Sequence, residues 1–173
     1  MTRTEKTVTG ERADLLETLT KHRYFLRYTV RDLDDEQAAQ RTTVSELCLG
    51  GLIKHIAFTE RQWINFIVDG SSAMGNWEEG SLDDWSAGFR MLEGETLAGL
   101  LAEYDQVARR TDELVATLPD LDISHPLPEA PWFEPGARWS ARRVLLHVIA
   151  ETAQHAGHAD ILRESLDGAK SMG

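Results

Sequence analysis

Apolar residues recur at three- and four-residue steps over four long stretches of this 173-residue chain, and alternating strand patterns are nearly absent. This spacing places the apolar side chains on one face of a helix. Residues 11–33 predict a first long helix, because no glycine or proline interrupts them. The acids from Asp34 to Glu36 suit the first turn of a short helix that follows. The pattern predicts an all-α fold, a four-helix bundle with long connections, in a single domain spanning residues 1–173.

Capping and turn residues bound the other three long helices. Thr43 or Ser45 can cap the second, Thr96 the third and Ser140 the last, since short polar side chains accept hydrogen bonds from free amides of the first turn. Pro119 ends the third helix because proline cannot continue one. The expected ranges are 43–68 or 45–68 for the second, 97–118 for the third and 141–166 for the last, and residues 1–10 are expected to be a frayed lead-in.

A glycine pair and one cysteine lie near the start of the second long helix. Gly50 and Gly51 each cost roughly 1 kcal/mol relative to alanine inside a helix. We therefore expect a neighbouring helix or a ligand to approach closely there. Cys48 is the single cysteine of the chain and cannot form an internal disulfide. A buried, inert thiol in a reducing compartment is the expectation.

Two connections, residues 69–95 and 119–139, combine turn-forming residues with bulky aromatic ones. Long connections of this kind pack down or form the wall of a site. The second connection holds all five prolines, and a short strand-like piece is expected near residues 121–123. The tryptophans of these two connections, which we expect to shape the pocket, are Trp77, Trp85, Trp132 and Trp139.

The charge balance excludes two classes of partner. The chain has 18 Lys and Arg against 29 Asp and Glu, a formal net charge of −11. Nucleic acids and anionic membrane surfaces require clustered basic residues, so neither is expected as a partner. No stretch approaches the ~18 apolar residues of a membrane-spanning helix, and the start of the chain lacks the apolar segment of a secretory signal. We expect a soluble cytoplasmic protein that acts on a small-molecule substrate.

Three of the six histidines fall within the last expected helix. At about 100° per residue, His147, Glu151, His155 and His158 lie within an arc of roughly 80°. Burying several imidazoles with a carboxylate is costly unless something pairs them, and one divalent cation pairs them all. Glu151 and His155 are one turn apart and can bind the same ion.

A further ligand is expected from another helix. His55 is the candidate, because it lies mid-helix among apolar neighbours. His22 is flanked by Lys21 and Arg23, which indicates a solvated face. His125 precedes a proline in a connection, and we expect it to be exposed.

These residues resemble the DinB-like metalloprotein superfamily. The resemblance rests on His55 followed by Glu60 and on the run Glu151-Thr-Ala-Gln-His155-Ala-Gly-His158-Ala-Asp, and it covers nearly the whole chain. It implies a four-helix bundle that binds a divalent metal through one histidine of the second helix and a His-x-x-x-His pair in the last. Here Glu151 replaces the first histidine of that pair, as in mycothiol-dependent maleylpyruvate isomerase.

The resemblance assigns His55, Glu151 and His155 as ligands of a divalent metal. His158 stands where many relatives carry glutamine, either as a substitute ligand or as a neighbour of the ligands. The isomerase carries an additional C-terminal domain, so its activity is not implied. The nitrogen and oxygen ligands favour zinc or nickel as the metal. The resemblance further implies a homodimer.

Three functions remain open at this stage. The first is a thiol-dependent transferase or isomerase, in which the metal holds a low-molecular-weight thiol as the thiolate that attacks an electrophile. Glu60, Arg61 and His158 are candidate polar helpers, although Glu60 and Arg61 are otherwise expected on the solvated surface. The second is a metal-dependent hydrolase of a small substrate, with Glu151 or another acid as the base. The third is a non-catalytic stress protein that binds a metal or a small molecule.

Overall fold

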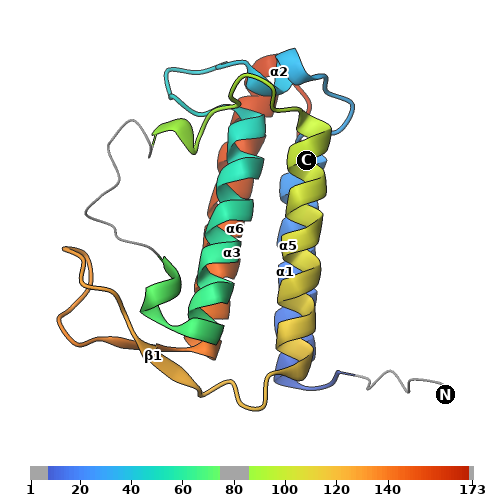
Figure 1. Ribbon diagram of the computed structural model, residues 1–173. Helices are drawn as coiled ribbons and strands as arrows, with labels where there is room; N and C mark the ends of the chain where they lie inside the picture. Colours follow the sequence, from blue (N-terminus) through green and yellow to red (C-terminus); the bar gives the residue numbers. More distant parts are fainter. Residues whose placement is uncertain (1–7, 75–85, 172–173) are drawn as a thin grey trace.

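The computed structural model describes residues 8–74 and 86–171. Within this part of the chain, four long helices stand side by side, with α6 behind α3 and α1 behind α5 in Figure 1. Each helix packs against its two neighbours in the order α1, α6, α3, α5. These helices are α1 (Glu11–Tyr28), α3 (Leu49–Asp69), α5 (Leu97–Thr117) and α6 (Ala141–Asp167). The all-α four-helix bundle predicted from the periodicity is confirmed.

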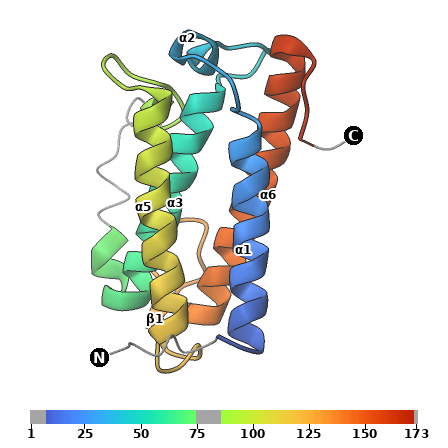
Figure 2. The same cartoon turned by 90° about the vertical axis from the view of Figure 1, so that its right-hand side faces the viewer.

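Short elements connect the long helices. The helix α2 (Asp35–Ala39) and the 3-10 helix η1 (Ser71–Met74) flank α3, and a two-stranded antiparallel sheet precedes α6. Figure 2 shows α2 at one end of the bundle and the sheet at the other. The strands are β1 (Ser124–Pro126) and β2 (Arg138–Ser140). The strand predicted near residues 121–123 therefore lies slightly later in the chain. The tryptophans at 77 and 85, and most of the lead-in expected to be frayed, fall outside the described residues.

The first helix is shorter than predicted. It ends at Tyr28 rather than at residue 33, and Asp32 adopts a left-handed conformation with φ of 59°. The cause lies in α6, where Nη1 of Arg163 donates to the carbonyls of Thr29 and Arg31, both at 2.8 Å. These carbonyls are satisfied by a distant side chain instead of by a continuing helix.

The start of α3 is also later than predicted. Cys48 is its N-cap, and Sγ accepts from the amide of Gly51 at 3.3 Å. The hydroxyls of Thr43 and Ser45 instead accept from backbone amides two residues on, in a turn ahead of the helix. Cys48 is 1% exposed, so its predicted burial is confirmed.

The glycine pair accommodates a connection rather than a helix or a ligand. A Cβ on Gly51 would overlap the backbone carbonyl of Phe89, and one on Gly50 would overlap the side chain of Met91. The segment 86–91 therefore lies directly on the first turn of α3. Lys54, one turn further along α3, bonds the carbonyl of Arg90 at 3.3 Å and helps hold this segment in place.

The caps predicted for the last two long helices are confirmed. Thr96 accepts from the amide of Gly99 at 3.1 Å, and Ser140 accepts from that of Arg143 at 3.2 Å. Gly168 ends α6 in the left-handed conformation. None of the described helices is long and apolar enough to cross a lipid bilayer.

Candidate metal centre

Two facing helices bring three potential ligands together. His55 comes from α3, and Glu151 and His155 come from successive turns of α6. One ligand atom of each lies within 4.8 Å of the other two. The convergence expected from the sequence therefore exists in the fold.

Aromatic rings cover the α3 side of this cluster. The ring of Phe89 stacks on that of His55, with centroids 4.1 Å apart and planes at 25°. His55 also meets the ring of His155 in a T-shaped contact, at a centroid distance of 4.9 Å. The Thr59 hydroxyl lies 3.5 Å from Nε2 of His55. The close approach that Gly51 permits is what places Phe89 over His55, a link that periodicity alone did not reveal.

The carboxylate of Glu151 lies between two imidazoles without bonding to either. Its Oε1 is 3.8 Å from Nε2 of His147, and its Oε2 is 3.7 Å from Nε2 of His155. Both distances exceed that of a hydrogen bond. Among residues 8–74 and 86–171, no donor lies within hydrogen-bond distance of this carboxylate, although its side chain is only 28% exposed. A partly buried acid without a donor is unfavourable unless a cation accompanies it.

Burial sets the protonation of the three groups. It lowers the pKa of His55 to about 4, with a contribution from the nearby His155. It lowers the pKa of His155 to about 4 as well, with His158 contributing. The pKa of Glu151 is raised by burial. Both imidazoles are therefore neutral at pH 7, the form in which histidine binds a metal.

His147 and His158 share the α6 face but lie outside the group of three. His147 packs against the ring edges of Trp63 and Trp139, at centroid distances of 4.9 and 5.1 Å. Burial and the charge of Arg143 lower its pKa to about 4. His158 is exposed, and its Nδ1 lies 3.3 Å from Nδ1 of His155.

Glu60 and Arg23 were both expected on solvated faces, and both expectations are wrong because the two side chains are buried. Glu60 is completely buried, where it accepts from Nε of Arg23 at 3.3 Å, from Nη2 of Arg23, and from the hydroxyl of Thr111 at 2.6 Å. At 100° per residue, Glu60 points about 140° away from His55 around α3. It is therefore a partner of α1 and α5 and not a polar helper of the cluster. Arg61 pairs at the surface with Glu103.

The two remaining histidines, His22 and His125, are not part of the cluster. His22 is half-buried on α1. His125 is not exposed as expected, because it is half-buried in β1 and its Nε2 lies 3.2 Å from the carbonyl of Ile67 at the end of α3. Its ring therefore joins the sheet to α3.

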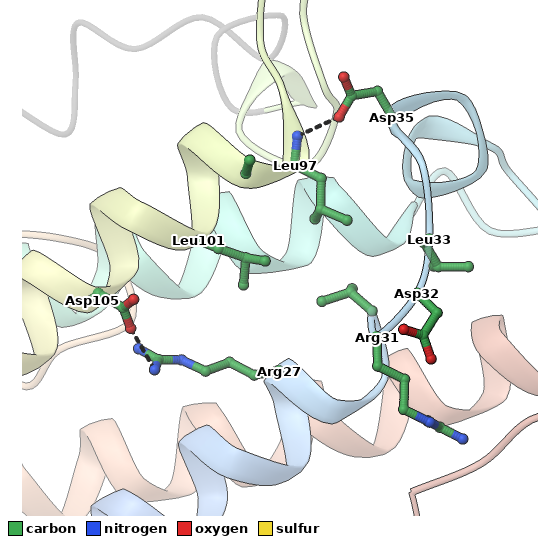
Figure 3. A pocket seen from close by; sticks show the side chains of 10 residues that line it. Arg27, Arg31, Asp32, Leu33, Asp35, Leu97, Leu101 and Asp105 are labelled. Carbon is green, nitrogen blue, oxygen red and sulfur yellow. Dashed lines mark hydrogen bonds and ion pairs between the residues drawn. The ribbon is translucent and has the colours of Figure 1, made fainter.

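A cavity of about 470 Å³ lies where the end of α1 meets α2 and the start of α5. Figure 3 shows Arg27 paired with Asp105 on one side, and Asp35 accepting from the Leu97 amide on the other. No member of the histidine cluster lines it. The cavity and the candidate metal centre are thus separate features.

An all-α bundle whose facing helices join histidines and a carboxylate is the architecture of a DinB-like protein. Within that class, the chain belongs to the mycothiol-S-transferase family, whose sequence profile matches residues 14–168. The resemblance noted in the sequence is thereby confirmed.

One solved structure supports the same fold. It is described as the conserved protein of locus from Enterococcus faecalis, with 12% sequence identity and a TM-score of 0.70. The match covers 94% of this chain and 100% of that one, and at this identity it supports the fold alone. Comparison with curated proteins gave no match.

Proposed function

We propose that this protein is a metal-dependent transferase that joins mycothiol, a low-molecular-weight thiol, to a small electrophilic substrate. The observation that carries the proposal is the meeting of His55, Glu151 and His155 within 4.8 Å, around a carboxylate that lacks a donor among the described residues. Membership in the mycothiol-S-transferase family supports the choice of thiol and of reaction.

The residues present suit a divalent cation. Two neutral imidazoles and one carboxylate form a nitrogen and oxygen donor set of the kind that binds zinc or nickel. Burial keeps the pKa of His55 and His155 near 4, so protons do not compete for these nitrogens at pH 7. Three protein ligands leave coordination positions for a substrate, as in catalytic zinc sites.

The chain's own side chains perform the remaining tasks. Phe89 shields one face of His55 from water, and Glu151 supplies the negative charge of the centre. A divalent ion bound there favours the thiolate form of a coordinated thiol at neutral pH. The thiolate sulfur forms a bond to an electrophilic carbon of the substrate, while the electron pair of the broken bond departs with the leaving group.

Elemental analysis and a thiol-transfer assay test this proposal together. We expect about one divalent ion per chain, and its loss in His55→Ala and His155→Ala. His22→Ala is the matched control, since it removes a half-buried histidine outside the cluster. The assay measures the conversion of a chromogenic aryl halide, which should require both the bound ion and mycothiol.

Other outcomes identify the alternatives. Turnover of an ester substrate without any thiol would favour the hydrolase. A retained ion without turnover of either substrate would favour a binding protein. A wild-type protein that transfers mycothiol equally well after removal of all metal would overturn the proposal.

A further inference from the structure

The side chain of His155 lies between two different neighbours. Its Nε2 faces Glu151, at 3.7 Å from Oε2, and its Nδ1 faces the Nδ1 of His158 at 3.3 Å. Glu151 precedes it by one turn of α6, whereas His158 follows it by three residues. The two ring nitrogens of His155 therefore have separate surroundings.

We propose that His158 is a positioning residue that accepts a hydrogen bond from Nδ1–H of His155 and so directs Nε2 toward the candidate metal centre. This inference rests on the proposed function. A nitrogen that binds a cation carries no hydrogen, and a neutral imidazole has one hydrogen to place. Because Nε2 lies on the side of Glu151, the hydrogen belongs on Nδ1, where His158 is within reach.

The geometry also separates His158 from the ligand set. Its imidazole is exposed and meets the ring of His155 from the outside, with ring centroids 5.2 Å apart. Among the described residues, the group whose ligand atoms converge contains His55, Glu151 and His155 but not His158. Of the two roles that the sequence left open for His158, the structure favours support of a ligand.

Histidine ligands commonly depend on such a partner. The hydrogen bond from the second ring nitrogen fixes the tautomer and the ring plane, and its loss typically lowers metal affinity by 10–100-fold. His158 is exposed, so its replacement leaves no cavity. A variant at this position therefore reports on His155 without disturbing the core.

Three variants test the assignment. His158→Leu removes the acceptor, His158→Gln retains a carbonyl oxygen that can accept, and Gln154→Leu places leucine at another exposed position of α6. The dissociation constant for Zn²⁺ is measured by competition with a chromophoric chelator. We expect His158→Leu to weaken binding by about 10–100-fold, His158→Gln to recover most of that loss, and Gln154→Leu to match the wild type.

Nitrogen-15 NMR of the zinc-loaded protein provides a second measurement. The wild type should show a protected proton on Nδ1 of His155, and His158→Leu should lose that protection. Equal zinc affinity in wild type and His158→Leu overturns the inference while leaving the metal centre intact. Complete loss of zinc in both His158 variants also overturns it, by making His158 a ligand. A wild type that binds no zinc overturns the proposed function as well.

Discussion

Two acids of the bundle, one buried and one partly buried, have opposite surroundings. Glu60 on α3 receives hydrogen bonds from Arg23 and Thr111, and Arg23 also bonds Asp112 at 2.8 Å. Glu151 on α6 has imidazoles at 3.7 and 3.8 Å and no hydrogen-bond donor in the described part of the chain. The first acid is satisfied by the fold itself, whereas the second is not.

This difference separates a structural group from a candidate functional one. Burial opposes the charge of Arg23, but the charge of Glu60 and the hydrogen bonds to it raise the Arg23 pKa above its usual value. Burial raises the pKa of Glu151, and no cationic side chain of the described residues offsets that effect. An acid held in this way binds an added cation at little cost, because no internal partner must be displaced.

The largest expected effect on stability comes from breaking the ion pair between Arg23 and Glu60. Glu60→Gln keeps the shape of the side chain but removes the fully buried counter-charge of Arg23, which then has only the partly exposed Asp112 as an ionic partner. We expect the free energy of unfolding to fall by about 3–5 kcal/mol, measured by urea denaturation with metal chelated. Arg61→Ala, which removes a surface pair with Glu103, is the control and should cost no more than about 1 kcal/mol. Equal losses in the two variants would contradict the distinction.

The same substitution at Glu151 should change the stability of the protein only when metal is bound. In chelated protein, Glu151→Gln should change the free energy of unfolding by less than about 1 kcal/mol, since no hydrogen bond is lost. Zinc at 100 times its dissociation constant should stabilise the wild type by about 2.7 kcal/mol. We expect most of this gain to vanish in Glu151→Gln, as measured by thermal unfolding with and without zinc. If zinc stabilised Glu151→Gln as much as the wild type, Glu151 would not be a ligand of the ion.

The helices were predictable where their causes are local. The hydroxyls of Thr96 and Ser140 cap their own helices through amides three residues on, so a short sequence window contains the whole interaction. The end of α1 was not predictable in this way. It depends on Arg163, which reaches the carbonyl of Thr29 from the far end of the chain.

The candidate site shows the same division. The shared face of Glu151 and His155 follows from helical spacing, and the approach of His55 was expected from its apolar setting. The burial of Arg23 was missed because charged residues are rarely buried unless paired. One signal was available, since Arg23 lies four residues after Leu19 and three before Leu26, within the apolar stripe of α1.

A third prediction concerns a substitution that should weaken the candidate metal centre without replacing a ligand. Gly51→Ala would push a Cβ into the carbonyl of Phe89, so the segment stacked on His55 must shift. We expect a loss of about 1–3 kcal/mol in the free energy of unfolding, together with weaker zinc binding. Gly157→Ala is the matched control, because a Cβ there meets nothing within 4 Å and should be neutral or stabilising by up to about 1 kcal/mol. Wild-type zinc affinity in Gly51→Ala would show that the segment is not needed to hold His55.

The smallest expected effect is the pH dependence of the chelated protein. His55, His147 and His155 have a pKa near 4 in the fold, below the ordinary value of 6.5. The unfolded chain therefore binds protons as pH falls through 6.5 while these three groups of the folded chain do not, and stability declines down to about pH 4. Above pH 6.5 these three groups add no slope. Urea denaturation from pH 7.5 to 4.5 should show this decline, and His155→Asn should make it shallower because one of the three groups is gone. An identical slope in the variant would mean that other groups govern acid sensitivity.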